Sequence, residues 1–223
     1  MENRRLINHL KGVITPERGD KIDKIVLDRT RHITIMLENI YQSQNASAVL
    51  RTADCLGIQD VHVVENENQF EVHPDIALGS SKWLTIHQYN NHENNTLSAI
   101  QALKGNGYRV IATMPHEQEC MIDDIDLSVP TVFMFGTELT GLSEGAIRLA
   151  DGYVKLPMYG FTESYNISVS AAILLYSVTQ RLRQSNIPWQ LTKEEQDEIV
   201  LDWCKKSIKT PDLIIERFLN NEH

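Results

Sequence analysis

The stretch from Leu156 to Ala172 reads LPMYGFTESYNISVSAA. An apolar strand leads into a loop that contains Gly160, and the loop leads directly into a helix of small residues. Ser164 and Asn166 stand at this turn, where the unpaired N–H groups of a helix start favour polar side chains. We therefore expect the loop to hold a small polar ligand through main-chain hydrogen bonds, and the helix after it to pack very close to another element.

The chain before this stretch alternates short apolar runs with helical patterns. Strands are expected at 33–37, 61–64, 108–114, 131–135 and 153–158, and helices at 45–57, 97–103, 142–149 and 166–183. Such alternation is typical of an α/β domain with a mainly parallel sheet and helices on both faces. Residues 66–73 and 87–96 are rich in Asn and are expected to form loops.

The two ends of the chain differ from this central part. Residues 1–30 are expected to form a basic helical arm. Residues 186–223 contain a capping box, Thr192 with Glu195, and a second helix that starts near Pro211. We therefore divide the chain into the arm 1–30, a central domain 31–185 and a helical extension 186–223.

The composition is that of an intracellular protein with a full core. Of the 223 residues, 42% are hydrophobic, which is enough for a packed domain. The N-terminus lacks a signal sequence and no apolar run reaches about 18 residues, so we expect a cytoplasmic protein without a membrane partner. The three cysteines, Cys55, Cys120 and Cys204, lie far apart and predict reduced, buried thiols.

The net charge of −9 argues against a general polyanion binder. Residues 1–31, however, carry eight Lys or Arg against five Asp or Glu, and smaller basic clusters occur at 181–183 and 205–209. Phosphate contacts are short-ranged at physiological salt, so local basic patches on an acidic body can still bind nucleic acid. The charge pattern also fits ordinary solvated faces, and both interpretations stay open at this point.

Three polar clusters follow predicted strands, at the sheet edge where open α/β folds bind ligands. The first contains Asn45 as an expected N-cap, and Arg51 among apolar residues, where an arginine needs an anionic partner. The second, residues 135–143, places Glu138 two residues after Gly136 and ends at Ser143, an expected N-cap. The third is the loop of residues 156–172. Each cluster alone also fits a structural role, as a salt bridge or a capped turn.

Other kinds of site find little support in the sequence. The eight histidines show no metal-ligand spacing, so we expect no metal. Neither a GxGxxG motif nor a GxxxxGK[ST] loop is present, which argues against dinucleotide and nucleoside triphosphate binding.

Taken together, in this order and spacing, the three clusters resemble the SPOUT superfamily of S-adenosylmethionine-dependent RNA methyltransferases, and most closely its TrmH branch of tRNA guanosine ribose 2′-O-methyltransferases. Residues that match the three motifs are Asn45, Ala48, Arg51, Thr52 and Ala53, then Gly136, Glu138, Gly141, Leu142 and Ser143, then Leu156, Pro157, Met158, Gly160, Ser164, Asn166, Ile167, Ser168, Val169, Ser170, Ala171 and Ala172. Thr137 and Tyr165 depart from the usual Asn and Leu.

The resemblance implies a deep trefoil knot in the C-terminal part of the sheet. It also implies a homodimer in which the partner's first motif completes each site, with S-adenosylmethionine as the methyl donor. The implied catalytic residues are Asn45, Arg51, Glu138, Ser164 and Asn166. The implied cofactor-binding residues are Thr113, Met114, Gly136, Leu156, Met158, Ser164, Tyr165 and Asn166.

The activity implied is methylation of a guanosine ribose 2′-OH in tRNA, at position 18 of the D-loop. Arg51 would bind phosphate and stabilise the developing alkoxide, while Glu138 or a substrate phosphate takes the proton. RNA phosphates would be held by Arg4, Arg5, Arg18, Arg181 and Arg183. Two alternatives stay open: a ribosomal-RNA ribose methyltransferase, and a catalytically silent RNA-binding SPOUT protein. The short segment before the first strand and the C-terminal helices favour tRNA.

Overall fold

In the computed structural model of the chain, residues 2–114 and 120–220 are described. The chain divides into two compact units. One unit spans residues 31–189, and the other combines residues 1–30 with residues 190–223.

The unit of residues 31–189 is built on a parallel sheet. The described strands are β1 (Ile33–Glu38), β2 (Asp60–Val64), β3 (Thr85–Tyr89), β4 (Arg109–Thr113), β5 (Thr131–Phe135) and β6 (Gly152–Val154). Their order in the sheet is β3-β2-β1-β5-β4-β6, and every pairing is parallel. The predicted α/β fold with a parallel sheet is therefore confirmed. Because all strands run the same way, their carboxyl ends share one edge of the sheet.

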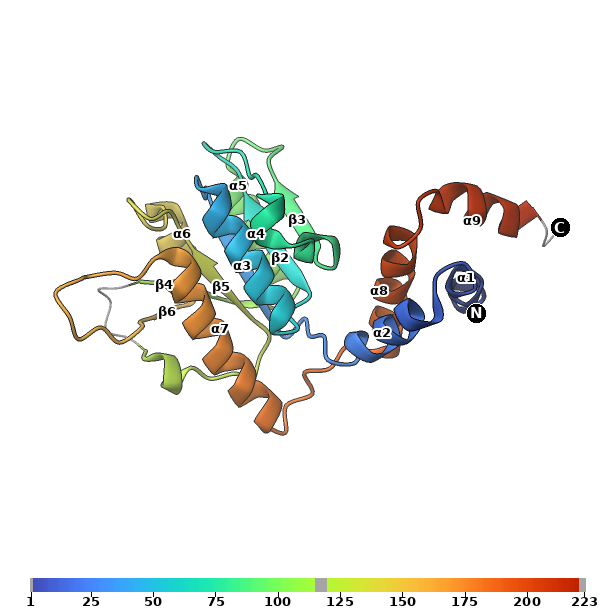
Figure 1. Cartoon of the computed structure of the whole chain (residues 1–223). Coiled ribbons are helices and arrows are strands. Elements are labelled where there is room, and N and C mark those ends of the chain that lie inside the picture. Colours follow the sequence, from blue (N-terminus) through green and yellow to red (C-terminus); the bar gives the residue numbers. More distant parts are fainter. Residues whose placement is uncertain (1, 115–119, 221–223) are drawn as a thin grey trace. The chain divides into compact units, whose positions relative to one another are not determined.

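Helices cover both faces of this sheet. Helices α3 (Ser43–Cys55) and α7 (Ile167–Gln184) lie side by side on one face, and α5 (Asn95–Gly105) and α6 (Glu144–Leu149) pack together on the other (Figure 1). Shorter helical turns are α4 (Pro74–Ala77), η1 (Ser80–Lys82) and η2 (Ile122–Asp124).

The central strand β5 shows why helices cover both faces of the sheet. Phe133 and Phe135 enter the core beneath α3 and α7, whereas Val132 and Met134 enter the core beneath α5 and α6. All five residues of β5 are buried, as expected for a strand covered on both faces. Each such apolar side chain stabilises the fold by about 2 kcal/mol.

Three predictions from the sequence were wrong. Residues 87–96 were expected to be a loop, but 87–89 belong to β3, an edge strand whose half-exposed TIHQY sequence hides the strand pattern. Asn45 is not an N-cap, because α3 begins at Ser43 and Asn45 lies inside its first turn. Of the three cysteines predicted to be buried, Cys204 is buried, whereas Cys55 at the end of α3 is exposed and Cys120 is only partly buried. The predicted N-cap at Ser143 is confirmed: its side chain accepts from the Ala146 N–H at 3.1 Å.

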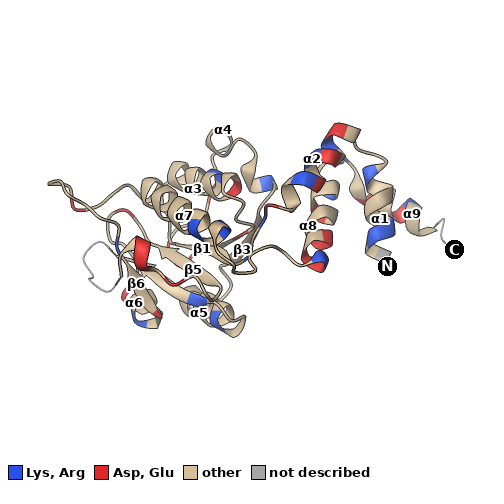
Figure 2. Cartoon of the chain, turned by 90° about the horizontal axis from the view of Figure 1, so that it is seen from below, with Lys and Arg blue, Asp and Glu red and all other residues tan. Residues whose placement is uncertain are grey.

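The second unit is helical. It contains α1 (Glu2–Lys11), α2 (Pro16–Val26), α8 (Lys193–Lys206) and α9 (Pro211–Asn220). The predicted capping box of Thr192 and Glu195 opens α8. Basic residues outnumber acidic ones on α1, the two kinds are equal in number on α2, and acidic residues outnumber basic ones on α8 (coloured blue and red along the ribbon in Figure 2). No helix in the described ranges is both long and apolar enough to cross a membrane.

Candidate active site

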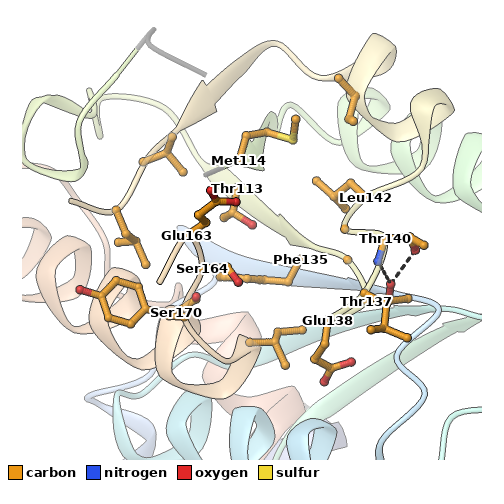
Figure 3. Close-up of a pocket in the computed structure, with 18 of the residues that line it drawn as sticks. Thr113, Met114, Phe135, Thr137, Glu138, Thr140, Leu142, Glu163, Ser164 and Ser170 are labelled. Atoms are coloured by element: carbon orange, nitrogen blue, oxygen red, sulfur yellow. Dashed lines mark hydrogen bonds between the residues drawn. The ribbon is translucent and has the colours of Figure 1, made fainter. Parts of the chain in front are cut away.

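A cavity of about 380 Å³ opens at the carboxyl edge of the sheet, among the segments that follow β4, β5 and β6 (Figure 3). Its volume is within the range of small-molecule sites in proteins. The predicted cofactor residues that line it are Thr113, Met114, Gly136, Leu156, Met158, Ser164 and Tyr165. Thus the strand ends and both Gly-containing loops identified in the sequence meet around one cavity.

The loop after β5 is closed on itself and tightly packed. The N–H of Thr137 donates to the Gly141 carbonyl and the N–H of Gly141 donates to the Thr137 carbonyl, each at 3.0 Å. A Cβ atom at Gly136 would lie only 2.1 Å from the carbonyl carbon of Gly141, so only glycine fits there. Gly141 itself has a φ of 69°, which glycine adopts without strain. The hydroxyls of Thr137 and Thr140 are 2.7 Å apart and brace the turn (Figure 3).

Glu38 anchors the far end of this loop, and the sequence interpretation missed it. Its carboxylate accepts the N–H and the hydroxyl of Ser143, both at 2.8 Å, and the hydroxyl of Thr96 at 2.5 Å. Only 1% of Glu38 is exposed, so these donors compensate the cost of burying a charge. The signal was present in the sequence, because Glu38 directly follows the buried apolar run of β1.

The loop before α7 is held from its C-terminal end. The side chain of Asn166 caps α7 by accepting from the Ser168 N–H at 2.8 Å, as the sequence predicted for this turn. The hydroxyl of Tyr165 donates to the Pro157 carbonyl at 3.1 Å, which closes the loop across its base. Ser164 and Glu163 line the cavity (Figure 3).

One hydrogen-bond network joins the three sequence clusters. The amide nitrogen of Asn45 donates to the Oε1 atom of Glu138 and, at 2.9 Å, to the Oε1 atom of Gln42. The amide nitrogen of Asn166 donates to the Oδ1 atom of Asn45 at 3.1 Å. Gln42 is a second residue that the sequence interpretation missed. The only hint of its role was that a polar residue stands three positions before Asn45, where a helix was expected to start.

Arg51 lies apart from this network. It is exposed on α3 and lines a second, shallow hollow with Ile173 and Tyr176 of α7. Within the described part of the chain it makes no salt bridge, so the structural alternative of a partner carboxylate is not realised there. The guanidinium is therefore available to an anion from outside this unit.

The predicted RNA-binding arginines occupy several elements. Arg4 pairs with Asp197 at 2.8 Å, and Arg5 and Arg18 are exposed on α1 and α2. In the last turn of α7, Arg181 donates to the carbonyls of Ile122 and Ile125 at 2.9 and 2.6 Å. Arg183, also in that turn, donates to the Leu56 carbonyl at 3.2 Å and lies over the Trp189 ring.

A separate buried polar cluster lies on β2 and β3. Burial, aided by the neighbouring His87, lowers the pKa of His62 to about 4. Burial would raise the pKa of Asp60, but the His87 imidazole, 3.6 Å away, and the charge of Arg31, 3.2 Å away, lower it on balance. No group of three or more His, Cys, Asp or Glu in the described ranges could hold a metal ion. The cluster lines neither hollow described above.

Comparisons with known proteins agree on one group. Residues 32–176 match the SpoU rRNA Methylase family. A tRNA (guanosine(18)-2′-O)-methyltransferase of Borreliella burgdorferi is 41% identical over 96% of both chains. One of Thermus thermophilus is 32% identical, covering 86% of this chain and 98% of its own. A crystal structure of the TrmH/SpoU tRNA modifying enzyme of Aquifex aeolicus superposes with a TM-score of 0.76 at 26% identity, covering 86% of this chain and 97% of the other.

Proposed function

This chain belongs to the SpoU rRNA methylase family, and from that premise we propose that it transfers a methyl group from S-adenosylmethionine to the ribose 2′-OH of guanosine 18 in tRNA. The observation that carries the proposal is the network of Asn45, Glu138 and Asn166 beside the cavity, because it unites three separated segments at one place. The choice of tRNA is supported by relatives of that name that match nearly the whole chain.

The cavity suits S-adenosylmethionine chemically. Met114, Leu142 and Leu156 offer apolar walls for a base, and the backbone of the two loops offers donors and acceptors. The carboxylates of Glu138 and Glu163 suit a ligand that carries a sulfonium and an ammonium group. When bound, this co-substrate supplies an activated methyl group.

The chain's own residues then align the ribose and handle its proton. A guanidinium stays protonated in proteins, so Arg51 is unsuited to act as a base. We assign it to the phosphate next to the target ribose and to the charge that develops on the 2′-oxygen. Glu138, held by Asn45, or a substrate phosphate accepts the proton.

The proposed enzyme is a homodimer. Val169, Ile173 and Tyr176 of α7 are 44%, 39% and 60% exposed and form an apolar face beside Arg51. Such a face suits a second copy packed around a twofold axis, with each Arg51 serving the partner's cavity. The segments 1–30 and 186–223 hold tRNA in this proposal, the central loops form the trefoil knot, and the enzyme works in the cytoplasm.

The test uses an unmodified tRNA transcript, methyl-labelled S-adenosylmethionine and nucleoside mass spectrometry. We expect labelled 2′-O-methylguanosine at one D-loop position, and no product with a transcript in which guanosine 18 is replaced. Label in a ribosomal-RNA transcript but not in tRNA would instead identify an rRNA methyltransferase. Cofactor and tRNA binding without any product would identify a silent RNA-binding protein.

A further inference from the structure

We propose that α3 serves two different sites in the dimer: Asn45 works in the cavity of its own chain, whereas Arg51 works in the cavity of the partner. The resemblance assigns the whole first motif to the partner, so this inference divides that motif. It rests on the dimeric methyltransferase proposed above.

Asn45 uses all the hydrogen-bonding groups of its side chain within its own chain. A side-chain amide has two N–H donors and one carbonyl oxygen. Both donors of Asn45 are used within the chain, by Gln42 and Glu138, and its oxygen accepts from Asn166. Asn45 is also 92% buried, with 8% exposure. Its amide is therefore committed to its own chain and has no N–H left to reach across an interface.

Arg51 lies on a different side of α3 from Asn45. Six residues of α-helix separate it from Asn45, a rise of about 9 Å and a rotation of about 240° around the axis. Arg51 consequently faces away from its own cavity and lies with Ile173 and Tyr176 on the side where a second copy would pack. Two residues of one motif thus face two different environments.

Gln42 gains a role from this arrangement. It accepts one Asn45 donor and thereby directs the other toward Glu138. Gln42 is a positioning residue in this account, and Asn45 positions the Glu138 carboxylate.

Mixed dimers test the division. Two variants are co-expressed with different affinity tags, and the mixed dimer is isolated by sequential purification and checked by intact mass. We use Asn45→Ala, Arg51→Ala and Glu138→Ala, since alanine is well tolerated within or beside a helix. Methyl transfer to tRNA is measured for each homodimer and each mixed dimer.

The dimer of Arg51→Ala with Glu138→Ala tests the proposed function first. If the partner's Arg51 serves each site, one of two sites is intact, and about half of the wild-type rate per dimer returns. No recovery would overturn the shared site, and the division of α3 with it.

The other two mixed dimers test the division itself. Asn45→Ala with Arg51→Ala should recover about half of the wild-type rate, because the two defects fall in one site and leave the other intact. Asn45→Ala with Glu138→Ala should stay as inactive as the homodimers, because each cavity then carries a defect. The reverse result for either pair, with Arg51→Ala and Glu138→Ala complementing, would overturn the division and leave the proposed function standing. A fully active Asn45→Ala homodimer would overturn it as well.

Discussion

The polar residues in the first and third turns of α3 lie in opposite environments. In the first turn Asn45 is buried, and Gln42, Glu138 and Asn166 use the hydrogen-bonding groups of its amide. In the third turn Arg51 is exposed beside an apolar face of α7 and makes no salt bridge within the described residues. The same helix therefore contributes one residue that belongs to the fold of its own chain and one that does not.

This difference separates two kinds of mutational effect. Removing a group that is satisfied inside the chain leaves buried donors or acceptors without partners, which lowers stability as well as activity. Removing a group whose partner comes from outside the chain changes catalysis and leaves the stability of the fold almost unchanged.

Arg51→Ala should show the purely catalytic kind of effect. We expect turnover to fall by about 1000-fold, equivalent to about 4 kcal/mol, because stabilisation of charge in the transition state is lost. The melting temperature and the affinity for S-adenosylmethionine should stay close to wild type. Single-turnover kinetics, calorimetric titration and thermal melting measure these quantities. Lost cofactor binding, or near-normal turnover, would contradict the role given to Arg51.

Glu38→Ala should show the structural kind of effect. Two hydroxyls and one N–H that now donate to the carboxylate would lose their acceptor, so we expect about 3 kcal/mol less stability in urea unfolding. Glu38→Gln is the matched control, since its amide oxygen keeps part of the acceptor capacity and should lose less. Equal stability of Glu38→Ala and wild type would show that Ser143 needs no anchor.

Gly136→Ala should displace part of the cavity wall and thereby weaken cofactor binding. Its methyl group would meet the Gly141 backbone at 2.1 Å, so the loop of residues 137–141 must move. We expect S-adenosylmethionine to bind about 100-fold more weakly, which corresponds to about 2.7 kcal/mol. Gly145→Ala is the control, because a Cβ there meets nothing closer than 3.7 Å and alanine favours the helix. Equal affinities in the two variants would argue against this loop as a cofactor wall.

The pH dependence of stability tests His62, a residue whose interactions lie within its own chain. Its pKa is about 4 in the folded protein, and the unperturbed value is 6.5. Between these values the unfolded chain binds a proton that folded His62 does not, so stability falls as the pH falls from 6.5 toward 4. At pH 5 this difference in proton binding lowers the free energy of unfolding by about 2 kcal/mol. Urea unfolding of wild type and His62→Gln at pH 7 and pH 5 measures it, and an unchanged pH dependence in the variant would contradict this assignment.

The sequence carried most of the fold and the outline of the site. Buried strands such as 131–135 are almost wholly apolar, and Gly136, Gly141 and Asn166 stand where the backbone requires them. These signals are local, and local signals survive in a single sequence. The edge strand β3 escaped notice because its half-exposed residues lack both the apolar run and the clean alternation of an ordinary strand.

The hydrogen-bond partners of individual side chains could not be predicted from the sequence in this way. Asn45 has the composition and place of an N-cap, yet its amide serves Glu138, which is 93 residues away. Glu38 reaches Ser143 across 105 residues, and Asn45 and Arg51, six residues apart on α3, face different surroundings. Such contacts depend on how distant segments meet in three dimensions, which spacing along the chain does not specify.

Calorimetric titration of the wild-type protein with S-adenosylmethionine is the decisive experiment, since the proposed reaction needs a methyl donor bound between the loops after β5 and β6. We predict saturable binding with one molecule per chain, weakened in Gly136→Ala and retained in Arg51→Ala. A folded protein that shows no saturable binding would contradict the account.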